Sequence, residues 1–242
     1  MMSSTLHSLE SFLFLSFFFL PLHHNTTAPT IMSALQDSVD YYLVLDFEAC
    51  CEQDKKLSVQ EIIEFPTLLV NSSTLMTEDE FHVYIKPTVH PHLSAFCTQL
   101  TGIEQKTVDD GVTIDKALSM HREWLQKHHL IYTDLQDQQP LHSFVFITCG
   151  DWDLKTCLPL ELKAKGIPLP RHYANPGWIN IKLAFEQITG AKPSGMQSML
   201  SILGLSLEGK HHSGIDDCRN IARILTTLVK RGWRAKRCLL YT

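Results

Sequence analysis

An apolar stretch that ends in two carboxylates constrains the fold of this chain more than any other feature. Residues 41–45 read Tyr-Tyr-Leu-Val-Leu and are followed by Asp46, Phe47 and Glu48. On a β-strand, residues i and i+2 point to the same face, so the two acidic side chains are expected to stand side by side. Two such anions repel each other unless a cation lies between them, which predicts a divalent-metal site. The alternative is a strand that runs out into an acidic loop.

The composition is that of an ordinary globular protein. The 242 residues are 44% hydrophobic and 19% charged, which is enough for a sizeable core. The formal net charge of −5 argues against a protein that grips duplex nucleic acid over its whole surface, but it does not exclude a nuclease with local contacts. The seven cysteines contain no C-x-x-C pair, which indicates neither a disulfide framework nor a structural zinc site.

Residues 1–40 differ from the rest of the chain. Residues 12–22 form an apolar run that is too short to span a bilayer but long enough for a signal peptide. No Lys or Arg precedes Lys55, whereas secretory signals begin with basic residues, so we expect an intracellular protein, cytoplasmic or nuclear, without stable membrane insertion. Secretion is the less favoured alternative. We expect a disordered or leader-like segment over 1–40, a single domain over 41–237 and a tail over 238–242.

Hydrophobic patterns predict the elements of that domain. Three strands with short links, at 41–48, 61–70 and 81–86, favour an antiparallel meander. A strand buried on both faces is expected at 144–148, and a short strand or helix at 178–181. Helices are expected at 114–125, 153–166, 196–203 and 216–230. Strands followed by alternating helices and strands predict an α/β domain with a mixed sheet.

Two carboxylates lie just past the buried strand, at a helix start, where α/β sheets often place ligands. Either could be only an N-cap. We assign the capping role to Asp151 and the metal role to Asp153, because 153, 157 and 160 share a helix face that is expected to bury Cys157 and Leu160.

The start of the last helix contains two H-x-x-x-x-D patterns in adjacent registers, 211–216 and 212–217. Helical phase separates them, because Asp217 lies on the apolar stripe and Asp216 lies off it. An inward acid needs a partner, and the alternatives are a metal, a lysine or a capping role. We expect His212 to reach solvent and a reacting water, and His211 to be solvated. The stripe consists of Ile221, Ile224, Leu225 and Leu228.

With these residues identified, the chain resembles the DEDDh group of 3′-to-5′ exonucleases. Within that group it is similar to the enhancer-of-RNAi and histone-mRNA 3′ exoribonuclease family, and most similar to the branch of prion-protein-interacting exoribonucleases. The matching phrases follow one another at 44–49, 61–66, 96–97, 100–103, 149–153, 178–180 and 212–217. The five DEDDh positions fall on Asp46, Glu48, Asp153, His212 and Asp217.

The resemblance implies a ribonuclease H-like fold, with a mixed five-stranded sheet flanked by helices. It also implies hydrolysis of single-stranded RNA from the 3′ end, with release of nucleoside 5′-monophosphates. The four carboxylates would hold two Mg²⁺ ions, or Mn²⁺, and the positive charge of the ions would balance that of the carboxylates. His212 would act as the general base, since an imidazole titrates near neutrality. Residues 1–40 lie outside the resemblance.

Several residues are candidates for contact with the substrate. Apolar and aromatic side chains can stack on a terminal base of any sequence, and the alternative for each is a place in the core. The basic run near the C-terminus could meet the phosphate backbone, or it could be a solvated face. Cys50 stands where the family usually has Thr, which puts substrate contact at that position in question. The candidates are Phe96, Leu100, Thr101, Ile103 and Trp152; the basic run is Lys230, Arg231, Arg234, Lys236 and Arg237.

The preference for RNA comes from the resemblance alone. A DNA exonuclease would use the same chemistry, and a catalytically silent RNA- or protein-binding module could keep the fold. A protein partner is suggested by the name of the branch. The presence of all five DEDDh residues favours the enzyme.

Overall fold

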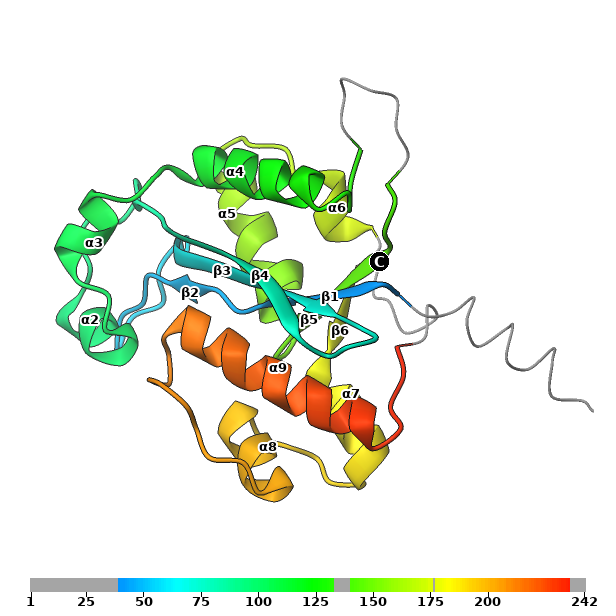
Figure 1. Ribbon diagram of the computed structural model, residues 1–242. Coiled ribbons are helices and arrows are strands. Elements are labelled where there is room, and N and C mark those ends of the chain that lie inside the picture. The colour runs from blue at the N-terminus through cyan, green and yellow to red at the C-terminus, as the bar shows by residue number, and fades with distance from the viewer. Residues whose placement is uncertain (1–38, 133–139, 176, 236–242) are drawn as a thin grey trace, which may run out of the picture. The chain divides into compact units, whose positions relative to one another are not determined.

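A mixed β-sheet runs through the part of the chain that the computed structural model describes, residues 39–132, 140–175 and 177–235 (Figure 1). Its strands are β1 (Tyr41–Leu45), β2 (Glu48–Ala49), β3 (Ile62–Asn71), β4 (Thr77–Tyr84), β5 (Phe144–Thr148) and β6 (Trp178–Asn180). β3 pairs antiparallel with β1, β2 and β4, and β5 pairs parallel with β1 and β6. The expected α/β fold with a mixed sheet and an initial antiparallel meander is confirmed. Nearly all of the predicted segment 1–40 and the whole tail 238–242 lie outside the described residues.

The sheet in the described range has six strands rather than the expected five, because the predicted acidic strand is interrupted. β1 and β2 follow one another along the same edge of β3, in one register as far as Glu48, and the pairing shifts between Glu48 and Ala49. Asp46 and Phe47 form the break, and Asp46 comes opposite Pro66, which has no N–H to donate to the ladder. The N–H of Phe47 is instead donated to Asp153 Oδ1, at 2.9 Å. The interruption therefore connects the sheet to a carboxylate more than a hundred residues away.

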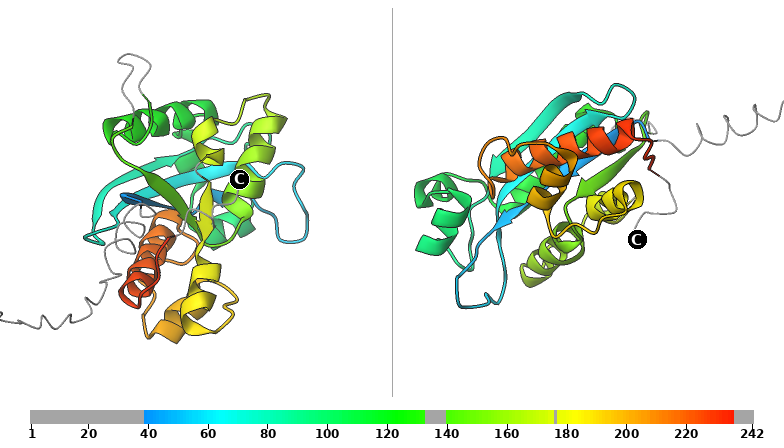
Figure 2. Two further views of the ribbon diagram at one scale, coloured as in Figure 1. Left: turned by 90° about the vertical axis from the view of Figure 1, so that its right-hand side faces the viewer. Right: turned by 90° about the horizontal axis from the view of Figure 1, so that it is seen from below.

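Helices cover both faces of the sheet (Figures 1 and 2). They are α2 (Ala95–Thr101), α3 (Gln105–Asp109), α4 (Ile114–Lys127), the π-helix η1 (Asp153–Cys157), α5 (Leu158–Ala164), α6 (Arg171–Ala174), α7 (Ile181–Thr189), α8 (Met196–Leu203) and α9 (Gly214–Lys230). α4, α5 and α6 lie on one side, and α7, α8 and α9 lie on the other. Among the described residues, no helix combines the length and the apolar character needed to cross a bilayer.

Alternate residues of β1 enter two separate cores. Tyr42 and Val44 pack with the helices α7, α8 and α9, whereas Leu43 and Leu45 pack on the opposite face with α4 and α5. This is the two-residue period of a strand, and burial on both faces explains the continuous apolar run. Each buried side chain of this kind contributes about 1.5–3 kcal/mol by leaving water. The strand that carries the acidic pair is therefore held firmly on both sides.

The periodic helices agree closely with expectation. α4 buries six residues at helical spacing, Ile114, Ala117, Leu118, His121, Trp124 and Leu125, and α8 ends at Gly204 in a left-handed conformation with φ of 73°. His121 of α4 is a packed core residue, since it is fully buried and its Nδ1 lies 2.8 Å from Tyr173 Oη. β4 begins at Thr77, four residues before the predicted start, because its first half is a charged and largely exposed hairpin arm.

Candidate active site

Asp46 lies in the break between β1 and β2, Glu48 begins β2, and both line one cavity of about 440 Å³. Asp217 of α9 lines the same cavity. Carboxylate oxygens of these three residues lie within 4.8 Å of one another. Glu48 is 8% exposed and Asp217 is 3% exposed, while Asp46 opens further into the cavity. The same-face spacing expected for the acidic pair is thus present, and the last helix adds a third acid to it.

Asp153 is the first residue of η1 and is 4% exposed. Its Oδ1 accepts the N–H of Phe47, which stands between Asp46 and Glu48 in the sequence. Asp153, the fourth predicted acid, is therefore held by a hydrogen bond to the break between β1 and β2. Its negative charge is close enough to raise the pKa of Asp46.

Two details of the predicted helix at Asp153 are wrong. Asp151 does not cap the helix through its side chain; its Oδ1 accepts hydrogen bonds from Trp178 Nε1 at 3.1 Å and Asn180 Nδ2 at 3.4 Å. Leu160 is 58% exposed rather than buried. The helix begins with a π-turn, whose i→i+5 bonds change the angle between successive side chains, so an argument from α-helical phase places Leu160 on the wrong face.

Asp217 and Asp216 lie as the helical phase of α9 predicts. Asp217 is buried, and its Oδ2 accepts the backbone N–H of His212 at 3.0 Å. Asp216 is only partly buried and accepts from the N–H of Lys210 and from Arg219 Nη1. The inward acid therefore also closes the loop that carries the histidines.

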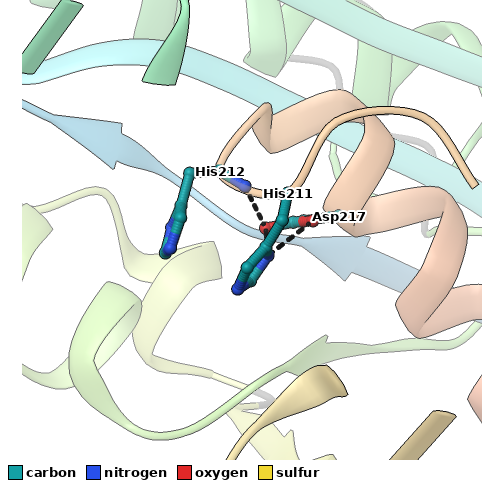
Figure 3. Close-up of side chains that lie close together, drawn as sticks. All are labelled: His211, His212 and Asp217. Carbon is teal, nitrogen blue, oxygen red and sulfur yellow. Dashed lines mark hydrogen bonds and ion pairs between the residues drawn. The ribbon is translucent and has the colours of Figure 1, made fainter. Parts of the chain in front are cut away.

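We expected His211 to be solvated, but its imidazole contacts Asp217. Its Nδ1 lies 3.0 Å from Asp217 Oδ2 and 3.3 Å from Asp217 Oδ1. Its ring stacks on that of His212, with the ring centroids 3.9 Å apart. Figure 3 shows both imidazoles extending to the same side of the loop. The left-handed backbone of His212, with φ of 65°, turns the two consecutive side chains toward one another.

Glu64 of β3 positions the start of α9, and sequence reasoning missed it. Its carboxylate is 1% exposed and accepts the N–H groups of Gly214 and Ile215, at 2.9 and 3.1 Å. A carboxylate at a helix N-terminus satisfies orphan donors and complements the helix dipole. Gly214 is required there, because a Cβ would come within 2.8 Å of the carbonyl oxygen of Asp46. An acid inside an otherwise apolar strand was the signal that could have revealed this contact.

The pKa values of all four predicted acids, Asp46, Glu48, Asp153 and Asp217, are raised. Burial, followed by the negative charges of Asp217 and other acids, raises the pKa of Glu48 to about 9. Burial also raises the pKa of Asp153 to about 6, against the hydrogen bond from Phe47. Burial and neighbouring acids likewise raise the pKa of Asp46, and burial raises that of Asp217. No Lys or Arg forms an ion pair with any of the four in the described part of the chain.

The imidazole of His212 is poised in its neutral form. Burial, and then the proximity of His211, lowers the pKa of His212 below its usual value. A neutral imidazole at neutral pH has a nitrogen lone pair that can accept a proton.

The predicted substrate contacts divide into two groups. Leu100 and Trp152 line the cavity, and Trp152 is 36% exposed. Thr101 and Ile103 are buried, with the Thr101 hydroxyl donating to the Cys97 carbonyl. Phe96 is half-buried and is not among the residues that line the cavity.

Further cavity-lining residues were not predicted. Lys182, at the start of α7, supplies the one Lys or Arg side chain among the described residues that line the cavity. Cys51 and Gln60 also contribute to its wall. Cys50, in contrast, is 3% exposed and packs in a small apolar cluster, so its side chain points away from the cavity. A single lysine after a strand carries no signal in the sequence.

The basic run near the C-terminus is distant from the cavity along α9. Lys230 ends this helix, thirteen residues after Asp217, which corresponds to roughly 20 Å of helix. Arg234 donates to the carbonyls of Val229 and Trp233, at 2.8 and 2.7 Å. Residues 236 and 237 lie outside the described part of the chain.

The mixed sheet and the carboxylates gathered at the end of β1 define a nuclease-type site on a ribonuclease H-like fold. Residues 43–225 match the Exonuclease family, and the chain belongs to this family. The family expected from the sequence motifs is confirmed.

Among curated relatives, the chain is 42% identical over 204 residues to ERI1 exoribonuclease 3 of Bos taurus, a match that covers 84% of this chain and 58% of the relative. It is 39% identical over 199 residues to the 3′-5′ exonuclease Snipper of Drosophila melanogaster, covering 79% of this chain and 70% of the relative. The chain thus spans a little over half the length of the ERI1 exoribonuclease 3 proteins that it matches.

Among solved structures, the nuclease domain of 3′hExo, described as a DEDDh family member bound to rAMP, matches with a TM-score of 0.73 and 32% identity. That match covers 82% of this chain and 96% of the other. A 3′-exonuclease that recognises the histone mRNA stem-loop matches with a TM-score of 0.73 and 31% identity, over 81% of this chain and 84% of the other.

Proposed function

We propose that this chain is a metal-dependent 3′-to-5′ exoribonuclease that releases nucleoside 5′-monophosphates from single-stranded RNA ends. The observation that carries the proposal is the group of carboxylate oxygens from Asp46, Glu48 and Asp217, within 4.8 Å of one another, beside the imidazole of His212 in one cavity. The relatives named exoribonucleases and the 3′hExo domain bound to rAMP support RNA as the substrate.

The residues of the cavity fit divalent cations. Oxygen ligands suit Mg²⁺ and Mn²⁺. Three buried acids and the partly buried Asp46, without a Lys or Arg partner among the described residues, are short of positive charge. Asp46, Glu48, Asp153 and Asp217 would hold two Mg²⁺ ions, or Mn²⁺. When bound, such ions offset the charge of the carboxylates and stabilise negative charge that develops on the phosphate.

His212 takes the proton of the attacking water in this proposal. Its lowered pKa keeps the imidazole neutral and able to accept a proton near neutral pH. Asp217 Oδ2 fixes the backbone of the same residue at 3.0 Å, and the stacked ring of His211 limits the movement of the imidazole. The base is therefore held at the wall of the cavity that the acids line.

The walls of the cavity supply contacts to the RNA. In this proposal Leu100 and Trp152 stack on the terminal base and Lys182 meets a backbone phosphate, which their positions in the cavity wall support. Substrate contacts of Phe96, Thr101 and Ile103 stay predictions. None of the three is among the residues that line the cavity, and Thr101 and Ile103 are buried. We assign the activity to a domain over 41–237. The described cysteines are all unpaired, which fits a reducing compartment such as cytoplasm or nucleus.

The proposal is tested with a 5′-labelled single-stranded RNA and the untagged protein in Mg²⁺, in Mn²⁺ and in chelator. A ladder that shortens from the 3′ end and stops in chelator supports the proposal, with 5′-monophosphates as the released product. The same assay on single-stranded DNA separates an exoribonuclease from a DNA exonuclease. Binding of RNA without shortening in either metal would instead support a catalytically silent module.

A further inference from the structure

The loop before α9 and the first turn of that helix bring two imidazoles and one carboxylate close together. His211 Nδ1 lies 3.0 Å from Asp217 Oδ2, and one ligand atom from each of His211, His212 and Asp217 lies within 4.8 Å of the other two (Figure 3). This set is chemically distinct from the Asp46, Glu48 and Asp217 set, because two of its three donors are nitrogen.

We infer that His211, His212 and Asp217 form an inhibitory site for a divalent cation of the zinc type. Imidazole nitrogen suits Zn²⁺ and similar transition metals, whereas carboxylate oxygen suits Mg²⁺ and Mn²⁺. Three protein ligands with an open fourth position are an ordinary zinc arrangement. The inhibitory effect rests on the proposed exonuclease function, whereas the binding site does not.

One pair of the three ligands already has nearly the separation that zinc requires. Zinc ligands at about 2.1 Å from the ion stand roughly 3.4 Å from one another in a tetrahedron, close to the present separation of His211 Nδ1 from Asp217. The ion would take the place of the hydrogen now shared by these two atoms. His211 and His212 are both partly exposed, so their rings can tilt toward a common ion. The left-handed backbone of His212 already brings the rings together.

Occupation of this site would stop the reaction in two ways. The lone pair of His212 would be engaged and could no longer accept a proton from water. Asp217 would be shared with the cation and withdrawn from the carboxylate group around Asp46 and Glu48, since the same side chain belongs to both sets. Zn²⁺ at this site would therefore compete with Mg²⁺ or Mn²⁺ for the carboxylate of Asp217.

The decisive variant is His211→Asn, which removes one zinc ligand and leaves all five DEDDh residues intact. Calorimetric titration of the untagged full chain with Zn²⁺ should show one tight site in the wild type, with affinity lowered on the order of 10- to 100-fold or more in the variant. His92→Asn, at an exposed histidine outside the loop, is the matched control and should keep the site. His7, His23 and His24 are present in every variant, so weak zinc binding there cancels in the comparison.

A second measurement needs no variant. Co²⁺ bound by two imidazoles and a carboxylate should give the visible absorption of a low-coordinate nitrogen-containing site, which an all-oxygen octahedral site lacks. Equal zinc affinity in wild type and His211→Asn, or no saturable site in the wild type, would overturn the inference.

Inhibition is measured separately, as the rate of RNA shortening in Mg²⁺ with added Zn²⁺, relative to the rate of each variant in Mg²⁺ alone. The inhibitory Zn²⁺ concentration should rise on the order of tenfold or more in His211→Asn and stay unchanged in His92→Asn. Unchanged inhibition in both variants would place the inhibitory zinc among the carboxylates and refute the proposed regulation. A chain that shows no shortening in any metal refutes the exonuclease proposal and leaves the titration to decide the zinc site.

Discussion

Two groups of buried carboxylates in the described part of the chain have opposite surroundings. In the cavity, burial and neighbouring acids raise the pKa of Glu48 to about 9. Glu61, the residue before β3, is also fully buried. Burial raises its pKa, but hydrogen bonds from Lys165 and three backbone N–H groups outweigh this effect and lower the pKa to about 2. Lys165 Nζ lies 2.8 Å from both Glu61 and Glu161.

The comparison shows that burial alone does not identify a reactive acid. Glu61 accepts the backbone N–H groups of Thr88, Val89 and His90, at distances down to 2.6 Å. Its carboxylate is therefore satisfied by hydrogen bonds that fix the loop over these residues. The cavity acids have few donors and no lysine or arginine ion pair among the described residues. A buried charge without such partners is costly, and a bound cation would remove that cost. The first group needs a ligand, and the second does not.

The largest expected effect is that of Asp46→Asn on catalysis. Because it removes a proposed metal ligand that would support several kcal/mol of transition-state stabilisation, the rate of RNA shortening should fall on the order of 10⁴-fold or more. The same change relieves repulsion among the cavity acids, so the metal-free variant should melt at or above the wild-type temperature. Activity within tenfold of wild type would show that Asp46 is not a metal ligand.

His212→Ala comes next, with an expected loss of about 10³-fold in kcat, within the range typical of a general base. Binding of RNA and of Mg²⁺ should change little, because the carboxylates remain. His92→Ala, at an exposed histidine, is the control for the loss of an imidazole. If His211→Ala were the more damaging of the two loop variants in Mg²⁺ alone, the assignment of the base to His212 would be wrong.

Local patterns were sufficient for the parts of the fold that a single segment determines. The strand at 144–148 and the helix at 196–203 were predicted at their observed bounds, because a buried run and a helical stripe are properties of neighbouring residues. The inward direction of Asp217 followed from helical phase in the same way.

Contacts between distant segments could not be predicted. The break in the acidic strand depends on which residue comes opposite Pro66, and this register is set by the folded sheet. Glu64 and Gly214 are 150 residues apart, and nothing local to either announces their hydrogen bond. The misassigned Leu160 depends on a π-turn that no sequence period reveals. The assignment of catalytic roles to the five DEDDh residues stays a prediction until the variants are measured.

The second acidic group is tested by Lys165→Met, which leaves Glu61 and Glu161 without their shared cation. Breaking a buried ion pair in this way should lower the free energy of unfolding by about 3 kcal/mol, measured by urea denaturation. Activity per folded molecule should be retained, because neither acid lines the cavity. Lys163→Met, at an exposed position of the same helix, should change stability by less than about 0.5 kcal/mol. Equal effects of the two variants would show that the buried pair contributes nothing.

The pH dependence of stability in chelator should have opposite signs for the two groups. Glu61 has a folded pKa of about 2, below its ordinary value of 4.5, so its contribution is present above pH 4.5 and is lost as the pH falls toward 2. Glu48 has a folded pKa of about 9, above 4.5, so the folded state holds an extra proton and stability falls as the pH rises between these values.

Each of these protons changes the free energy of unfolding by at most about 1.4 kcal/mol per pH unit. Urea denaturation across this range should therefore show a loss on each side, with Glu61→Gln removing part of the acidic loss and Glu48→Gln part of the alkaline one. Saturating Mg²⁺ should abolish the alkaline loss, because a bound cation replaces the protons of the cavity acids, and leave the acidic loss unchanged. An alkaline loss that persists in Mg²⁺ would show that the cation does not bind where Glu48 lies.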